Sequence, residues 1–261
     1  MSPGSGGIAL VSGAAGGIGA AVARVLAEQG STVVAVDRDE ARLTAVVDRL
    51  AADGLPVLAR PADVTAGPAV EALVEAVEQR IGPIDRLVNA AGVLRLAEAR
   101  RLSEEDWQTT LAVNTTGVFL LSRAVVNRMV PRRRGALVTV ASNAAATART
   151  EMAAYAASKA AAAAFTRCLG LEVARYGIRC NVVAPGSTDT PMLHGMHPPG
   201  TATRAAVAGN PDAYRTAIPL GKVATPLDVA QAVRFLLSEQ AGHITLETLT
   251  VDGGATLGAP A

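Results

Sequence analysis

Short apolar runs alternate with longer amphipathic stretches along most of this chain. The runs Ile8–Ser12 and Thr32–Val36 are apolar at almost every position, which is typical of strands buried on both faces of a parallel sheet. Similar runs occur at residues 57–59, 84–88, 136–140 and 178–183. Helical stretches separate them, including residues 20–29, 69–79, 153–171 and 226–237. This alternation predicts an α/β Rossmann fold, with a doubly wound parallel sheet and helices on both faces.

A glycine-rich turn directly follows the first apolar run. Its sequence is Gly13-Ala-Ala-Gly-Gly-Ile-Gly19, and an amphipathic helix comes after it. Gly13 permits a tight turn, Gly17 lets the backbone approach a pyrophosphate, and Gly19 lets the helix pack closely on the strand. The N-terminus of the helix offers free N–H groups and a partial positive charge to the phosphates. Strand, turn and helix together predict a dinucleotide-binding site.

An acidic residue, Asp37, ends the second apolar run eighteen residues after Gly19. A carboxylate at this position accepts hydrogen bonds from the ribose hydroxyls of NAD and repels the 2′-phosphate of NADP. Arg38 is the one contrary residue, because its guanidinium could partly neutralise such a phosphate. Since Arg38 directly follows the acid, we expect it to stack near the adenine or to face solvent. The predicted cofactor is therefore NAD.

Tyr155 and Lys159 stand four residues apart in a predicted helix, so the phenol and the ammonium share one face. A free tyrosine has a pKa near ~10. A cation held beside it favours the phenolate and lowers that pKa, which makes tyrosine a usable base near neutral pH. Ser142 ends an apolar run upstream and is expected to hold a substrate oxygen against the phenol. These residues suit proton transfer to or from an alcohol.

All of these motifs follow the carboxyl end of a predicted strand, except the Tyr155–Lys159 pair, which lies in a predicted helix. In an open parallel sheet such ends lie along one edge, where ligands bind. With the motifs in place, the chain resembles the classical short-chain dehydrogenases/reductases over essentially its whole length. The resemblance is carried by Gly13-x-x-x-Gly17-x-Gly19, Asp63, Asn89-Ala-Ala-Gly92, Asn114, Ser142, Tyr155-x-x-x-Lys159 and Pro185-Gly186. Membership implies seven strands in a single NAD-binding domain over residues 1–261.

The resemblance also implies roles for individual residues. Tyr155 is the expected proton acceptor, Ser142 orients the reacting oxygen, and Lys159 binds the nicotinamide ribose and tunes the phenol. Asn114 is expected to hold a water that links Lys159 to solvent. The expected cofactor-binding residues are Gly13, Gly17, Ile18, Gly19, Asp37, Arg38, Asp63, Val64, Asn89, Ala90, Gly92, Tyr155, Lys159, Pro185, Gly186, Thr188 and Thr190.

A narrower set of motifs resembles one subgroup of that family, the 2,3-dihydro-2,3-dihydroxybenzoate dehydrogenases. The matching segments are Asn89–Arg95, Val140–Asn143, Arg179–Thr190, Ile218–Lys222 and the tail from His243 to Gly258. This resemblance implies NAD-dependent oxidation of a cyclic dihydrodiol carboxylate, 2,3-dihydro-2,3-dihydroxybenzoate, to 2,3-dihydroxybenzoate. That reaction belongs to the biosynthesis of catecholate siderophores.

Substrate contacts are expected from Ser142 and Tyr155, and also from two arginines and a methionine. Arg95 follows the Asn-Ala-Ala-Gly turn and Arg149 precedes Tyr155, so both are expected at the mouth of the crevice. A guanidinium fork suits bidentate binding of a carboxylate. Met192 opens the segment 192–217, which is expected to be the mobile lid over the substrate. This segment is called the lid segment below.

Alternatives come from the lid segment, which carries His194, Met196 and His197 and lacks the tryptophans expected in close members of the subgroup. The leading alternative substrate is trans-2,3-dihydro-3-hydroxyanthranilate, which would be oxidised to 3-hydroxyanthranilate in secondary metabolism. A ketoacyl reductase is disfavoured because Asp37 indicates NAD. A catalytically silent NAD-binding regulator is a different class of function, and the complete set of catalytic residues argues against it.

Composition excludes several other classes of function. The net charge of +1 gives no nucleic-acid-binding surface. We expect no signal peptide, no membrane-spanning stretch and a cytoplasmic location. The two cysteines, Cys168 and Cys180, lack the spacing of metal ligands, so we predict no metal site and expect buried free thiols. Membership of the family implies a homotetramer in which the helix with Tyr155 packs on its counterpart through the small residues 160–164.

Overall fold

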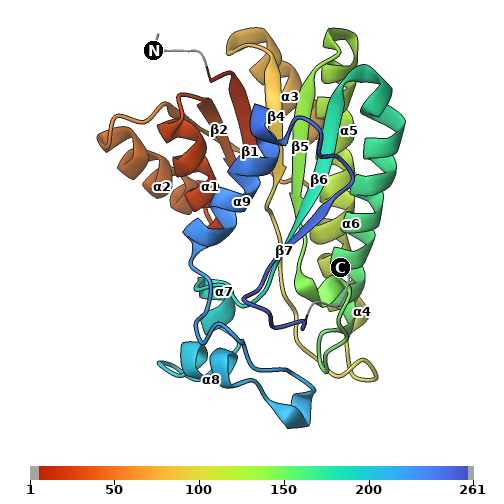
Figure 1. The fold of residues 1–261 in the computed structure, drawn as a ribbon. Helices are drawn as coiled ribbons and strands as arrows, with labels where there is room; N and C mark the ends of the chain where they lie inside the picture. Colours follow the sequence, from red (N-terminus) through yellow and green to blue (C-terminus); the bar gives the residue numbers. More distant parts are fainter. Residues whose placement is uncertain (1–5, 258–261) are drawn as a thin grey trace.

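The computed structural model describes residues 6–257, which form one seven-stranded parallel sheet between two layers of helices (Figure 1). The strand order is β3-β2-β1-β4-β5-β6-β7. The strands are β1 (Ile8–Ser12), β2 (Thr32–Asp37), β3 (Val57–Pro61), β4 (Ile84–Asn89), β5 (Gly135–Val140), β6 (Ile178–Pro185) and β7 (Thr248–Val251). The predicted fold class is confirmed. Residues 1–5, where no signal peptide was expected, and Gly258 of the tail motif lie outside the described part.

The apolar pattern identified every strand except β7. This strand has only four residues, and each of them is partly exposed at the edge of the sheet. A short, half-exposed strand lacks the continuous apolar run by which buried strands are recognised. The strands β2, β3, β4 and β6 also continue one or two residues beyond the predicted apolar runs, because their last residues, most of them polar or proline, still pair with neighbouring strands.

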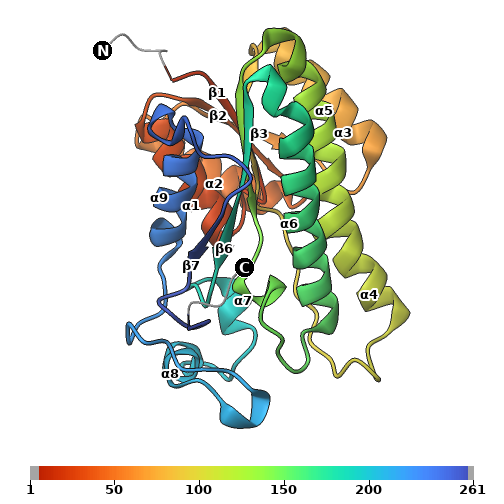
Figure 2. The same ribbon diagram turned by 45° about the vertical axis from the view of Figure 1, so that its right-hand side comes forward.

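Helices cover both faces of the sheet, as the alternating pattern predicts (Figure 2). One layer contains α1 (Gly17–Glu28), α2 (Glu40–Ala52) and α9 (Pro226–Leu237), and the other contains α3 (Gly67–Arg80), α5 (Gly117–Arg132) and α6 (Ala153–Val173). Successive side chains of β1 alternate between the layers: Ala9 and Val11 pack with the first layer, and Ile8 and Leu10 pack with the second. All five residues of β1 are buried, which explains their apolar character.

A π-helical turn joins α4 (Glu104–Leu111) to α5. The resulting run, Glu104–Arg132, is the one helix among residues 6–257 long and apolar enough to cross a membrane, although no such stretch was expected from the sequence. However, 56% of its most apolar window is buried inside the protein. This burial is typical of the core helix of a soluble protein.

The topology fixes the position of the site. Strand order reverses between β1 and β4, so the connections after these two strands diverge and leave a crevice at their carboxyl ends. The loops that follow β5 and β6 begin at this same edge of the sheet. The short helices α7 (Pro191–His194) and α8 (Ala202–Ala208), both from the lid segment, lie beyond that edge (Figure 1).

Candidate active site

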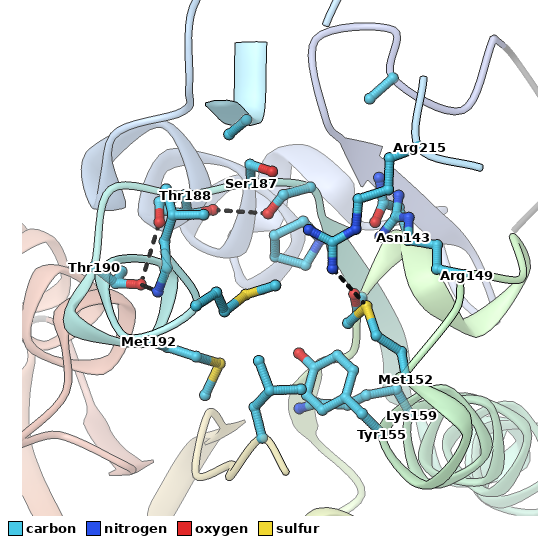
Figure 3. Close-up of a pocket in the computed structure, with 18 of the residues that line it drawn as sticks. Asn143, Arg149, Met152, Tyr155, Lys159, Ser187, Thr188, Thr190, Met192 and Arg215 are labelled. Atoms are coloured by element: carbon cyan, nitrogen blue, oxygen red, sulfur yellow. Dashed lines mark hydrogen bonds between the residues drawn. The ribbon is translucent and has the colours of Figure 1, made fainter. Parts of the chain in front are cut away.

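The crevice contains two neighbouring cavities, and a buried tyrosine–lysine pair lies in the larger one (Figure 3). Tyr155 and Lys159 are one turn apart on α6 and are only 8% and 5% exposed. Ser142 follows β5, is also buried, and lines the same cavity as the phenol. The structure therefore brings together the three side chains predicted to act on an alcohol.

Burial raises the pKa of Tyr155 above its usual value, whereas the hydrogen bond with Ser142 and the positive charge of Arg149 lower it. The sequence prediction assigned such a lowering to Lys159, which also lies near the ring. The Nζ of Lys159 lies 5.8 Å from the centroid of the tyrosine ring and donates a 2.9 Å hydrogen bond to the carbonyl of Val140. Arg149 is therefore a second cation near the phenol, and its charge favours the phenolate.

Lys159 lies in a dry part of the site, and burial lowers its pKa from 10.5 to about 8. Asn114, held by the π-helical turn, is fully buried beside it. The amide of Asn114 bonds both backbone groups of Val93, at 2.8 and 2.9 Å, which fixes its orientation. A Cβ on Gly92 would lie 3.2 Å from the Nζ of Lys159 and 3.4 Å from the Oδ1 of Asn114. Gly92 lines both cavities, whereas Asn114 lines neither.

The smaller cavity, of about 350 Å³, is built mainly from backbone around the glycine turn. Gly13 has a φ of +70°, and a Cβ there would lie 2.5 Å from the amide nitrogen of Ala91. A Cβ on Gly19 would overlap the carbonyl oxygen of Gly13. The cavity opens onto the first turn of α1, whose free N–H groups suit a pyrophosphate. These features fit a dinucleotide.

Most of the predicted cofactor residues line one cavity or the other. Asp37 is held in place because Oδ2 accepts from the amide of Ala15 at 3.2 Å and Oδ1 accepts from that of Asp39 at 3.1 Å. The remaining lining residues among those predicted are Gly13, Gly17, Ile18, Gly19, Arg38, Asp63, Val64, Ala90, Gly92, Pro185, Gly186, Thr188 and Thr190. The side chain of Asn89 lines neither cavity. It is buried in the sheet and donates to Ser122 at 2.9 Å.

The larger cavity, of about 440 Å³, receives three of the predicted substrate residues besides Tyr155 but not the fourth. Ser142, Arg149 and Met192 line it, whereas Arg95 does not. The guanidinium of Arg95 pairs with Asp106 at 3.3 Å on the outside. Its neighbours Leu94 and Leu96 line the cavity instead. In an extended segment alternate side chains point to opposite sides, so the middle residue faces away.

Several polar residues that line the larger cavity had no role predicted from the sequence, among them Asn143, Glu151 and Arg215. Asn143 donates to the buried carboxylate of Asp252 at 3.1 Å, which ties the loop after β5 to the C-terminal tail. Arg215 comes from the end of the lid segment, far along the chain from Ser142, Tyr155 and Lys159. Its proximity to Tyr155 could not be inferred from spacing.

A metal site is not evident: within residues 6–257, no three His, Cys, Asp or Glu side chains are grouped so as to hold an ion. Cys180 is buried, and burial raises the pKa of its thiol to about 12. Cys168 is exposed on α6, so the expectation of a second buried thiol is wrong.

The family model described as short chain dehydrogenase matches residues 7–199 of the chain. The chain belongs to the short-chain dehydrogenase family. It is therefore an oxidoreductase that uses a nicotinamide cofactor, and the predicted resemblance is confirmed.

Two curated relatives carry the same name, 2,3-dihydro-2,3-dihydroxybenzoate dehydrogenase. The protein from Bacillus subtilis (strain 168) is 52% identical over 96% of both chains. The protein from Escherichia coli (strain K12) is 41% identical over 95% of this chain and 96% of its own length. Among solved structures, a variant of actinorhodin polyketide ketoreductase with NADPH superposes with a TM-score of 0.88, at 34% identity and with 95% and 96% coverage.

Proposed function

We propose that this short-chain dehydrogenase oxidises 2,3-dihydro-2,3-dihydroxybenzoate to 2,3-dihydroxybenzoate with NAD, in the biosynthesis of a catecholate siderophore. The observation that carries the proposal is the composition of the larger cavity. The alcohol-oxidising residues Ser142 and Tyr155 share it with Arg149, a partly buried guanidinium suited to a carboxylate. The names of the two relatives add independent support.

In the proposed reaction the phenolate of Tyr155 accepts the proton of the C3 hydroxyl, and Ser142 holds that oxygen in place by a hydrogen bond. The chemistry that a bound nicotinamide would supply is acceptance of the hydride from C3. Lys159 would bind the nicotinamide ribose, and Asn114 would hold a water that links Lys159 to solvent. The C3 ketone then tautomerises: a proton leaves C2, one is gained by the C3 oxygen, and the ring becomes an aromatic catechol. Aromatisation makes the overall direction effectively irreversible.

The preference for NAD over NADP is supported by Asp37, whose carboxylate lines the smaller cavity. Arg38 and Arg42 line it too and could bind a phosphate, but Asp39 offsets Arg42 at 4.0 Å. We expect wild-type protein to have a higher kcat/KM with NAD than with NADP. Asp37→Ser should lower the ratio of these two values at least tenfold, because it removes the carboxylate that repels the 2′-phosphate of NADP. A wild-type preference for NADP would contradict the assignment of the cofactor.

The amino analogue, trans-2,3-dihydro-3-hydroxyanthranilate, is the second candidate substrate. Glu151 lines the larger cavity, and its carboxylate suits an ammonium group. Both candidates carry a carboxylate beside an oxidisable alcohol, so the same catalytic residues serve either one. They differ only in the group at C2.

Purified protein is therefore assayed with NAD and each dihydro-arene, following NADH absorbance and the aromatic product by chromatography. Rapid formation of 2,3-dihydroxybenzoate, with the amino analogue at least tenfold slower in kcat/KM, is the expected result. The reverse order would favour the second candidate. Absence of turnover on both, with NAD still bound, would favour a non-catalytic NAD-binding role.

We further propose a cytoplasmic homotetramer. The outer face of α6 presents the small residues Ala157 and Ala164 together with Leu171, which is 70% exposed. Trp107 and Phe119, from α4 and α5, are also exposed. Apolar side chains gathered on adjacent helices are suited to close helix–helix contacts between subunits. Size-exclusion chromatography with light scattering tests this, and a monomer would refute it.

A further inference from the structure

A second guanidinium, that of Arg215, enters the larger cavity beside Arg149 (Figure 3). Both side chains are partly buried. Each charge is costly here, because burial removes water from the guanidinium and no counter-ion takes the place of that water. Burial lowers the pKa of both guanidinium groups, and the charge of Arg215 further lowers that of Arg149.

These two residues differ from the arginines of the molecule that form ion pairs. Arg132 pairs with Glu78 at 2.6 Å and Arg134 pairs with Asp85 at 2.7 Å. Within residues 6–257 no carboxylate oxygen lies within 4.0 Å of Arg149 or Arg215. Two like charges that share a cavity without a carboxylate in contact create a strong local attraction for an anion.

The carboxylates that act on these guanidinium groups from further away are already engaged or lie at the rim. Asp252 acts on Arg149, but its oxygens accept from Asn143 at 3.1 Å and from Thr256 at 2.8 Å. Glu151 acts on Arg215 and is exposed to solvent. Neither one neutralises the pair inside the cavity.

Local structure aims Arg215 at the catalytic base. The backbone groups of Arg215 exchange two 2.9 Å hydrogen bonds with Asn210, which close a tight hairpin in the lid segment. The Nη2 of Arg215 lies 3.2 Å from the sulfur of Met152, and Met152 packs against the ring of Tyr155. A thioether is a weak, neutral acceptor, so this contact positions the guanidinium and leaves its charge available.

We propose that Arg215 is a second substrate-binding residue, which with Arg149 forms a two-guanidinium clamp for the carboxylate of a dihydro-arene. The proposal rests on the proposed function and deepens it, because it names the group that selects acidic over neutral dihydrodiols. Arg149 comes from the loop before α6 and Arg215 from the lid segment. A carboxylate bound by both joins these two parts, so substrate binding also holds the lid segment over Tyr155.

The test compares Arg215→Met with Arg204→Met. Both variants remove one positive charge from the lid segment, but Arg204 is exposed on α8 and does not line the cavity. The two substrates are 2,3-dihydro-2,3-dihydroxybenzoate and the neutral trans-dihydrodiol that lacks its carboxylate. Equilibrium binding of 2,3-dihydroxybenzoate and of catechol, by titration calorimetry with NADH present, gives a readout independent of turnover.

Arg215→Met should lose about 10- to 100-fold in kcat/KM for the acidic substrate and in affinity for 2,3-dihydroxybenzoate, since a charge-assisted hydrogen bond is lost. Its values for the neutral diol and for catechol should stay within about threefold, and Arg204→Met should match wild type throughout. Arg215→Lys should recover part of the loss because it keeps the charge. The melting temperature of each variant shows whether it is folded.

Equal losses on acidic and neutral ligands, or no loss on either, would overturn the clamp. Failure of the proposed function is a separate result. If wild type turns over neither dihydrodiol but still binds 2,3-dihydroxybenzoate more tightly than catechol, and Arg215→Met abolishes that difference, the clamp stands and the reaction does not.

Discussion

The two cavities of the crevice are built in different ways. The smaller one is shaped by backbone: the turn Gly13–Gly19, the helix terminus behind it and the ends of β1 and β4. The larger one is shaped by side chains that converge from the loop before α6, the lid segment and the C-terminal tail. Backbone sites tolerate little variation in shape, whereas side-chain sites change with single substitutions. The family can therefore keep one cofactor site while its substrate sites diverge.

The catalytic base in the larger cavity should give the largest effect. Tyr155→Phe removes only the phenolic oxygen, so the packing against Met152 remains. We expect kcat to fall by about 10³- to 10⁴-fold, because the proton acceptor is lost. Affinity for NAD, measured by titration calorimetry, should stay within about threefold, since the smaller cavity is unchanged. A variant that retains a tenth of wild-type turnover would refute the assignment of the base.

A buried charge at the boundary between the cavities should lower stability. Burial lowers the pKa of Lys159 to about 8, from 10.5 in the unfolded chain. Between these values the unfolded chain binds a proton that the folded chain has released, so stability rises with pH across this window. Below pH ~8 the shift corresponds to about 3 kcal/mol of destabilisation. Lys159→Met should therefore be about 3 kcal/mol more stable than wild type at neutral pH, and inactive.

Chemical denaturation at several pH values measures this difference. The gain should shrink steadily as pH approaches 10.5, the value for the unfolded lysine. Subtracting the two curves removes the contributions of Tyr155 and Cys180, which are common to both proteins. The matched control is Lys222→Met, at the exposed position of the chain's other lysine, which should show no gain. A constant difference across the whole range would contradict the buried-charge account.

The smaller cavity, which is shaped by backbone, should not accommodate even one additional methyl group. Gly19→Ala places a Cβ on the carbonyl oxygen of Gly13, and neither group can move without opening the turn. We expect a loss of about 2 kcal/mol in unfolding free energy, with a parallel loss of NAD affinity. In the control Gly67→Ala, the new Cβ lies 3.6 Å from Leu120, an ordinary contact. Similar stability and NAD affinity in both variants would show that the turn is not tightly packed.

This contrast also explains what could be predicted from the sequence. The glycine turn, Asp37 and the Tyr155–Lys159 pair depend on spacings within one strand, turn or helix, so local rules sufficed. Arg95 was misplaced toward the substrate because the side of an extended segment on which a residue points depends on its register. Arg215 was missed because a hairpin brings it back to the site from the lid segment. Long-range convergence of loops leaves no periodic signal.

Activity in the larger cavity should depend on the charges of the side chains that line it. Variants of Arg149, which lines the cavity, and of Arg95, which does not, test this. Arg149→Met should lower kcat/KM for the acidic substrate about tenfold, through loss of a charge-assisted contact. It should also raise the pKa of Tyr155, because the positive charge that favours the phenolate is gone. The rise of activity with pH would then move to higher pH. Arg95→Met removes only an exposed ion pair with Asp106, so its pH profile should match that of wild type.

The pH dependence of kcat, measured for both variants with NAD saturating, decides between two readings of Arg149. A guanidinium that only binds substrate would change KM and leave the pH profile in place. One that also supports the base moves the profile toward alkaline pH, and this displacement persists when substrate is saturating. A shift in Arg95→Met of the same size would mean that net charge near the cavity mouth, and not the position of Arg149, controls the ionisation of Tyr155.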